Sequence, residues 1–280
     1  MDGDQASASV DANTVDQLTD QATSSGSGSV TVAVKAPSDV SQVAVSLPAS
    51  AVADLADKTD AALNIETPVA SVTIPNDSLA ELSTGSQALS VTAAKNENNT
   101  VSITVAKDGE TVDKVSGGLK ATIPLEESTP GTVAVLVNPD GTETIIKKSI
   151  ASDGSVSLPL DGSATVKFVD NSQPFQDTQD HWAKSSIDFV SSHDLFNGTG
   201  NGNFSADRAM NRAMLVTVLH RLEDTPAGGS VSTWAEGAMS WAVGTGVISG
   251  TSGNRLDPNG SATRGEVATM LMRFVGYLNK

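Results

Sequence analysis

FQDTQDHWAKSSIDFV, residues 175–190, is the stretch at which the composition of the chain changes. The sequence upstream of it contains no Trp, Tyr, His or Arg, and Phe168 is its one aromatic residue. From Phe175 onward the apolar residues recur at the spacing of one helical face, and aromatic rings and guanidinium groups appear. The stretch therefore marks a boundary near residues 170–175 between two parts of different construction.

An internal repeat follows this boundary. Residues 181–223 and 233–275 align without a gap at an offset of 52, with 8 of 43 positions identical. The landmarks are paired residues, namely Trp182 and Trp234, Gly198 and Gly250, Arg212 and Arg264, and Arg221 and Arg273. Each copy predicts a first helix (182–193 and 234–245), a Gly-bearing loop and a second helix (212–222 and 264–274). Thr263-Arg264-Gly265-Glu266 predicts a capping box at the last of these helices.

The part before the boundary shows the alternation of β-strands. Segments such as SVTVAVKA (29–36), VSITVAKDG (101–109) and ATVKFV (164–169) are separated by turn sequences such as NPDG (138–141). This pattern predicts an antiparallel, all-β, sandwich-like domain over residues 29–170. VSLPASAVADL (45–55) and VTIPNDSLAEL (72–82) superpose, and predict a duplicated strand that ends at a Pro and leads into a short helix. Residues 1–28 are acidic and polar, and we expect a flexible lead-in, with a short helix over Thr14–Ala22 as the alternative.

Charge and composition exclude several classes of protein. The net charge is −16, and residues 1–174 hold 23 acidic residues against nine Lys, so we expect no nucleic-acid partner. The absence of Cys excludes disulfides and thiolate metal sites. No run of 18 apolar residues occurs, so we expect no membrane insertion. Met1 is followed by Asp2 and Asp4 rather than by a signal-peptide pattern, and an exported protein would have lost its leader.

Catalysis is also not expected. The part before residue 175 has no His, Cys, Arg or Trp, which removes most general bases, nucleophiles and sugar platforms. Its carboxylate pairs, such as Glu126-Glu127, lie in acidic loops where solvated charge is the ordinary interpretation. NPDGTE lacks the spacing of an EF-hand loop. We therefore predict no enzyme, no cofactor and no metal.

The repeated part resembles S-layer homology (SLH) repeats. Phe175 and Asp177 match the F-x-D opening of that family, and Thr263, Arg264 and Glu266 match its T-R-x-E motif. The matches also include Trp182, Trp234, Gly198, Gly246, Gly250, Phe204 and Arg212. The sequence departs from the pattern at Asp194, where a Gly is usual at a helix C-terminus, at Asn211 and Met214, and in having two repeats where the family commonly has three. Residues 29–170 resemble the β-rich segment that often precedes SLH repeats in exported Gram-positive proteins.

This resemblance implies a non-catalytic, extracellular cell-surface protein that is held on the cell wall by all-α SLH helix-loop-helix repeats at 171–225 and 226–280. The ligand it implies is secondary cell-wall polysaccharide, often pyruvylated. The candidate glycan-binding residues are Asp177, Trp182, Gly198, Arg212, Trp234, Gly250, Arg264 and Glu266. Arg212 and Arg264 open their predicted second helices, where a guanidinium and backbone amides can together bind a carboxylate.

Each candidate also has a structural interpretation that the sequence leaves open. Trp182 and Trp234 suit core anchors, Glu266 suits a helix cap, and Asp177 suits a loop brace; both Gly suit a special backbone conformation. The alternative function is a surface assembly or display module whose repeats bind other repeats or self-associate without glycan. Two repeats would leave apolar surface that oligomerisation, or packing on the β-rich domain, must cover.

Overall fold

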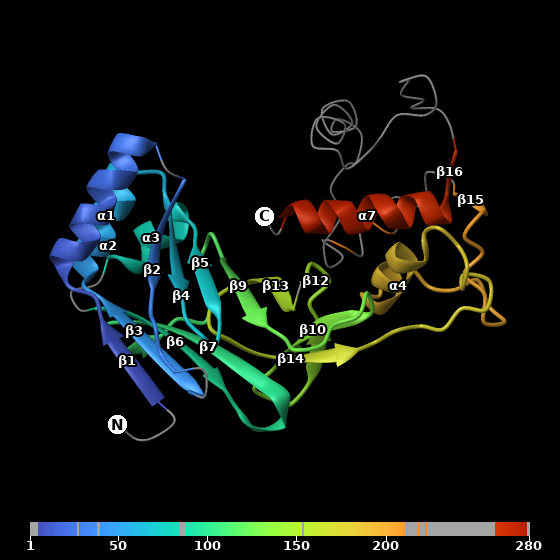
Figure 1. The fold of residues 1–280 in the computed structure, drawn as a ribbon, viewed down its shortest axis with the longest axis horizontal. Helices are drawn as coiled ribbons and strands as arrows, with labels where there is room; N and C mark the ends of the chain where they lie inside the picture. The colour runs from blue at the N-terminus through green and yellow to red at the C-terminus, as the bar shows by residue number, and fades with distance from the viewer. Residues whose placement is uncertain are drawn as a thin grey trace. The chain divides into compact units, whose positions relative to one another are not determined.

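The computed structural model describes residues 5–26, 28–37, 40–84, 88–152, 154–210, 218, 222 and 261–278. The chain divides into two compact units (Figure 1). Unit 1 comprises Met1–Glu127, Ala134–Thr144 and Ser152–Phe168. Unit 2 comprises Ser128–Val133, Ile145–Ala151 and Val169–Lys280. The repeats therefore share their compact unit with two short segments that come from the β-rich part of the sequence.

Two sheets carry the β-rich part of the chain. The first is eight-stranded, in the order β1-β3-β6-β7-β14-β10-β11 with β8 paired to β7, and the second is six-stranded, in the order β12-β13-β9-β5-β4-β2. The strands are β1 Gln5–Ser9, β2 Ser29–Ala33, β3 Gln42–Leu47, β4 Ala62–Glu66, β5 Ser71–Ile74, β6 Leu89–Lys95, β7 Thr100–Lys107, β8 Glu110–Thr111, β9 Leu119–Pro124, β10 Thr132–Val137, β11 Glu143–Ile145, β12 Ile150–Ser152, β13 Ser155–Leu160 and β14 Ala164–Asp170.

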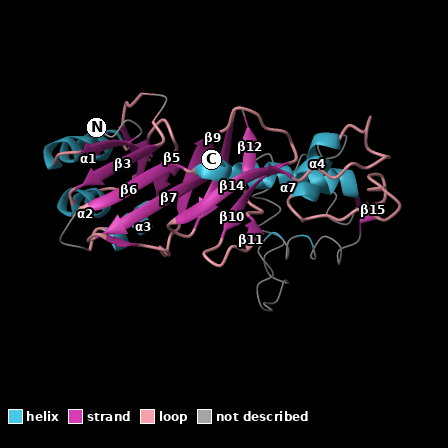
Figure 2. Ribbon diagram, turned by 90° about the horizontal axis from the view of Figure 1, so that it is seen from below, coloured by secondary structure: helices cyan, strands magenta, loops and turns pink. Residues whose placement is uncertain are grey.

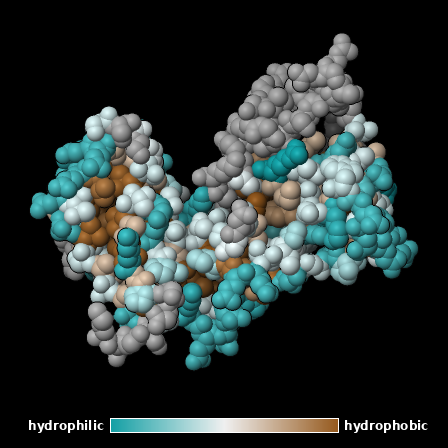
Figure 3. Space-filling model, in the orientation of Figure 1, coloured by the Kyte–Doolittle hydropathy of each residue, from teal (hydrophilic) through white to brown (hydrophobic). Residues whose placement is uncertain are grey.

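Strands of both sheets bury alternate residues, because successive side chains point to opposite faces. In β3 the buried residues are Val43, Val45 and Leu47, and in β9 they are Leu119, Ala121 and Ile123. Figure 3 shows apolar residues gathered at the end of unit 1 that carries its first helices, bordered by hydrophilic residues. The predicted β-rich fold is confirmed, but the expectation of an all-β domain is wrong because unit 1 also contains helices.

These helices are α1 Ala12–Ser25, α2 Ala49–Lys58 and α3 Asn76–Leu82. Each joins two strands, so that a strand–helix–strand element occurs three times: β1-α1-β2, β3-α2-β4 and β5-α3-β6. α2 begins directly after Pro48 and α3 directly after Pro75, as the duplicated sequence predicts. β1 pairs in parallel with β3, and β2 in parallel with β4, which relates the first element to the second. Figure 2 shows α1 and α2 side by side at one end of the unit.

The first of these elements replaces the predicted flexible lead-in, and its helix α1 contains the alternative helix predicted over Thr14–Ala22. Asp11 caps α1 by accepting a hydrogen bond from the Thr14 amide at 2.8 Å. Val15, Thr19 and Ala22 are buried along one face of the helix, and the Thr19 hydroxyl donates to the Val15 carbonyl. The apolar face of α1 is short and consists of small residues, so the composition of residues 1–28 predicted a flexible segment. Pairing of β1 with β3 and packing of α1 on α2 supply the stabilisation that the local sequence lacks.

Unit 2 contains α4 Lys184–Ser192, α7 Arg264–Leu278 and the strand pair β15 Ala209–Met210 and β16 Ala262–Thr263. The predicted helices at 182–193 and 264–274 are present with shifted ends, and those at 212–222 and 234–245 lie largely outside the described residues. β16 directly precedes α7, β15 precedes the helix predicted at 212–222, and the two strands pair antiparallel. The expectation of purely α-helical repeats is therefore corrected, because backbone pairing joins one repeat to the other.

The core of unit 2 holds four of the aromatic rings that the sequence introduces after residue 174, all of them Phe. Its buried residues are Phe175, Ala183, Ile187, Phe189, Val190, Leu195, Phe196, Phe204, Ala206, Met210, Val218, Leu222, Val267, Ala268, Leu271 and Val275. Ile150, from the segment Ile145–Ala151, packs against this cluster. Asp194 has φ +56° directly after α4, in the position that the repeat pattern gives to Gly. None of the helices that the structure describes is long and apolar enough to cross a membrane.

His193 is fully buried at the end of α4. Its ring stacks on Phe189 with centroids 4.1 Å apart, and its Nδ1 donates to the Phe189 carbonyl at 2.7 Å. Its Nε2 lies 3.2 Å from the hydroxyl of Ser149, which comes from the same segment as Ile150. Burial lowers the pKa of His193 from 6.5 to about 4, although hydrogen bonds with Phe189 and Ser149 oppose the change.

Acid should therefore destabilise unit 2. Between pH 6.5 and 4 the unfolded chain binds a proton at His193 that the folded chain does not, so stability falls as the pH falls. We expect a loss of about 2 kcal/mol at pH 5 relative to pH 7 from this residue. Urea unfolding followed by Trp fluorescence measures it, because Trp182, Trp234 and Trp241 all lie in unit 2. His193→Gln should reduce the difference between the two pH values; an unchanged difference would contradict the assignment.

Candidate functional site

Asp177 braces the loop that precedes β15. Its two carboxylate oxygens accept hydrogen bonds from the backbone amides of Phe204 and Ser205, at 2.8 and 2.7 Å. Burial on its own would raise the pKa of Asp177, but these amides and the nearby His181 outweigh it, and the pKa lies below its usual value. Ser205 has φ +58°, so the carboxylate holds the backbone in a conformation that residues other than Gly rarely adopt.

Removing this carboxylate should loosen the loop. For Asp177→Ala we expect a loss of about 1.5 kcal/mol in the free energy of unfolding of unit 2, because two charge-assisted hydrogen bonds disappear at a partly solvated position. Urea unfolding followed by Trp fluorescence gives the value. Asp180→Ala, at an exposed residue three positions away, is the matched control and should change stability little. Equal effects of the two variants would argue against a bracing role.

Arg264 joins the second repeat to the loop of the first. The residue is only 5% exposed. Its Nε donates to the Phe204 carbonyl at 2.9 Å, and one terminal nitrogen donates to the Asn197 carbonyl at 2.6 Å. The guanidinium also lies over the rings of Phe204 and Phe196, with its central carbon 4.5 and 4.9 Å from their centroids. Burial lowers the pKa of Arg264, and the charge of Arg208 adds to the effect.

The N-terminus of α7 is capped by the protein itself. The Glu266 carboxylate accepts from the Thr263 amide at 2.7 Å, and the Thr263 hydroxyl accepts from the Glu266 amide at 3.2 Å, which confirms the predicted capping box. The amides of Arg264 and Gly265 donate to the carbonyls of Arg208 and Ala206. The first three amides of the helix are thus all bonded within the protein, and none is left for an anion.

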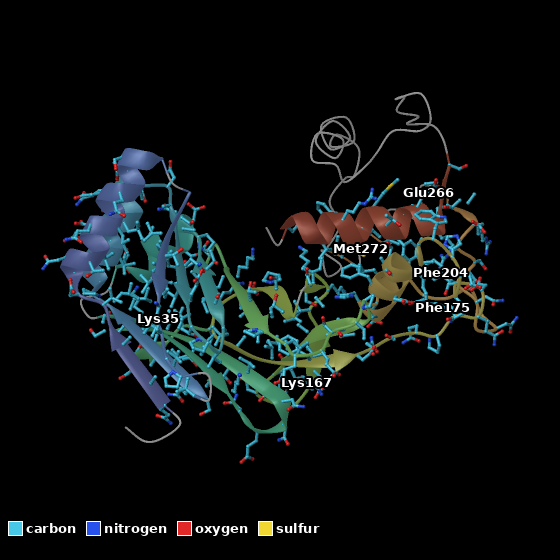
Figure 4. The ribbon with its side chains drawn as sticks, viewed as in Figure 1. Lys35, Lys167, Phe175, Phe204, Glu266 and Met272 are labelled. Carbon is cyan, nitrogen blue, oxygen red and sulfur yellow. The ribbon has the colours of Figure 1, made fainter. Side chains whose placement is uncertain are left out.

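Gly198 is required by close packing rather than by its backbone angles. A Cβ atom added there would lie 2.7 Å from Cε1 of Phe175 and 2.9 Å from the Asn203 carbonyl oxygen. Phe175 packs on Phe204 with ring centroids 5.3 Å apart, and Figure 4 shows the two residues together, with Glu266 at the start of α7. Asp177, Gly198 and Arg264 therefore all support one loop, residues 197–208.

Trp182 differs from these residues because it is 66% exposed. His181 lies beside it with ring centroids 5.4 Å apart, and the His181 Nε2 is 3.4 Å from a carboxylate oxygen of Asp207. The Asp207 side chain is 91% exposed. The result is a solvated surface, here called the Trp182 face, that consists of Trp182, His181 and Asp207.

The structure thus separates the candidates. Among the described ones, Asp177, Gly198, Arg264 and Glu266 hold the loop and the helix cap, although all of these except Arg264 are exposed, and Trp182 is the one whose large apolar side chain is presented to solvent. Arg212, Trp234 and Gly250 lie outside the described residues. Sequence reasoning missed His181 and Asp207. The His-Trp pair was visible in the sequence, but Asp207 is 26 residues from His181, and only the folded loop brings them together.

The family model of the S-layer homology domain matches residues 174–213 and 228–268, so the chain carries two SLH repeats. The match covers the two copies that the sequence pattern defines.

Two curated relatives extend this comparison. The chain is 26% identical over 196 residues to an amylopullulanase from Thermoanaerobacterium thermosulfurigenes, an alignment that covers 64% of the chain and 10% of the relative. It is 30% identical over 112 residues to a cellulosome-anchoring protein from Acetivibrio thermocellus, covering 35% of the chain and 25% of the relative. The chain therefore spans a quarter or less of the length of these relatives. No solved structure matches it significantly.

Proposed function

We propose that this is a non-catalytic protein of the bacterial cell surface, attached to the cell wall by SLH repeats that bind secondary cell-wall polysaccharide. The observation that carries the proposal is the Trp182 face. An exposed Trp is costly to leave in water, and a flat aromatic ring with polar groups at its edge suits the apolar face and hydroxyl rim of a sugar. The SLH repeats and the relative named as an anchoring protein support the same function.

The remaining candidates act through the shape of the loop. Asp177 and Arg264 fix loop 197–208, which carries Asp207 to Nε2 of His181, the neighbour of Trp182. In this proposal they are positioning residues, and the surface residues make the contact with glycan. Trp234, Gly250 and Arg212 lie outside the described residues and stay predicted glycan contacts.

Co-sedimentation of the full chain with purified Gram-positive sacculi tests the proposal. We expect binding that is lost after hydrofluoric acid strips the secondary polymer. Trp182→Ala should weaken binding at least tenfold, a change of about 1.4 kcal/mol, while the thermal midpoint stays the same because the ring is mostly solvated. Leu278→Ala removes the other large apolar side chain exposed among the described residues, at 45%, and is the matched control.

Two results would contradict the proposal. Binding that survives stripping would place the ligand elsewhere in the wall. Failure of the wild type to bind, together with a molecular mass that rises with concentration, would favour the assembly module in which repeats bind one another.

A further inference from the structure

We propose that the Trp182 face recognises an uncharged sugar ring, a neutral hexose or N-acetylhexosamine, through its hydroxyl groups, and does not bind the carboxylate of an acidic sugar or of a pyruvyl ketal. The inference rests on the proposed glycan-binding function and specifies its ligand. It follows from which groups of this surface are accessible and which are already used.

Hydrogen-bond roles on the Trp182 face are set by the backbone. The amide of Ala183 donates to Nδ1 of His181 at 3.1 Å, so in the neutral ring Nε2 carries the hydrogen and points to Asp207. His181 is therefore held in place, with only 13% of its side chain exposed. The exposed polar group beside His181 is the carboxylate of Asp207, which only accepts hydrogen bonds. A sugar hydroxyl offers the complementary donor.

An anionic ligand would meet an unfavourable charge on the same surface. Asp207 repels a carboxylate, and Asp180, also exposed, lies two residues before Trp182. Among the cations of the described residues near this surface, Lys184 is paired with Asp188 at 2.6 Å, and Arg208 is the sequence neighbour of Asp207.

In the described part of the chain, the groups at the start of α7 that would suit a carboxylate are already bonded within the protein. The guanidinium of Arg264 donates to two backbone carbonyls and is covered by two phenylalanine rings. The amides of Arg264, Gly265 and Glu266 donate to the protein as well. Arg264 and the N-terminal amides of α7, which the motif suggested as a site for a carboxylate, therefore join the two repeats instead.

The test compares two forms of one polymer, secondary cell-wall polysaccharide before and after mild acid removes its pyruvyl ketals. The affinity of the full chain and of Trp182→Ala for each form is measured at low and high salt. We expect the Trp182→Ala variant to bind both forms at least tenfold more weakly than the wild type, by the same factor, and that factor to change little with salt. Asp207→Asn should weaken binding a few-fold, and Asp180→Asn is the matched control.

The outcomes distinguish a failure of this inference from a failure of the proposed function. A Trp182→Ala effect that disappears when the ketals are removed would overturn the uncharged-sugar assignment and leave glycan binding intact. Asp207→Asn that strengthens binding of the ketal form alone would overturn it as well, as would wild-type binding that Trp182→Ala does not change. Absence of wild-type binding to either form would instead refute the proposed function.

Discussion

Replacing Arg264 with Ala should destabilise unit 2 by about 4 kcal/mol. The variant loses two hydrogen bonds from a charged donor and leaves the carbonyls of Phe204 and Asn197 without it at a largely buried position. It also removes the cation that lies over Phe204 and Phe196. Since these partners are in the loop of the first repeat and Arg264 is in the second, the variant should also weaken the association of the repeats. Urea unfolding followed by Trp fluorescence measures the loss.

Arg273→Ala is the control for Arg264, because it removes an exposed guanidinium from the same helix. Its effect should stay within about 0.5 kcal/mol. Arg264→Lys should recover little, since an ammonium group does not reproduce the forked donors of Arg. A stable Arg264→Ala protein that no longer binds cell wall would contradict the bracing role. It would indicate instead that Arg264 contacts the ligand directly.

The second large effect is expected at Gly198. Gly198→Ala should cost unit 2 about 3 kcal/mol, because the new methyl group would lie within 3 Å of both Phe175 and the Asn203 carbonyl. Because the Asn203 carbonyl oxygen belongs to the backbone, it cannot move alone, and the loop must shift to remove the close contact. Equilibrium unfolding gives the value, and wall binding should fall with it because Asp207 is carried by the same loop.

Neighbouring changes isolate this steric effect. Asn197→Ala, which alters an exposed side chain next to Gly198, should be nearly neutral. Phe175→Leu removes one of the two clashing atoms, so the Gly198→Ala, Phe175→Leu double variant should be more stable than the sum of the single effects predicts. Strict additivity of the two changes would show that the methyl group does not contact Phe175.

Local patterns predicted the elements that local sequence encodes. The capping box at Thr263–Glu266, the start of α7 at Arg264, and the strand–Pro–helix elements at Pro48 and Pro75 are all present. Asp194, where the repeat pattern usually has Gly, adopts the left-handed conformation that suits Gly. In each case a few consecutive residues contain both the hydrogen-bonding groups and the backbone restriction that the structure uses.

Contacts between residues that are far apart in the chain could not be predicted from the sequence. β1 and α1 depend on pairing and packing with later elements, and β15 and β16 are two-residue strands separated by 51 residues. Arg264 shows the limit most clearly. The motif gives its position at the helix start, but whether its guanidinium points to solvent or into the loop of the other repeat depends on Phe196, Phe204 and Asn197, which are 60 or more residues away in sequence.

The inclusion of Ser128–Val133 and Ile145–Ala151 in unit 2 has an evolutionary consequence. Ser149 and Ile150 contact His193 and the core of the repeats, respectively, so a gene fragment that begins after residue 170 encodes the repeats without two of their supporting residues. A recombination junction near residue 170 would therefore separate the repeats from both of these contacts.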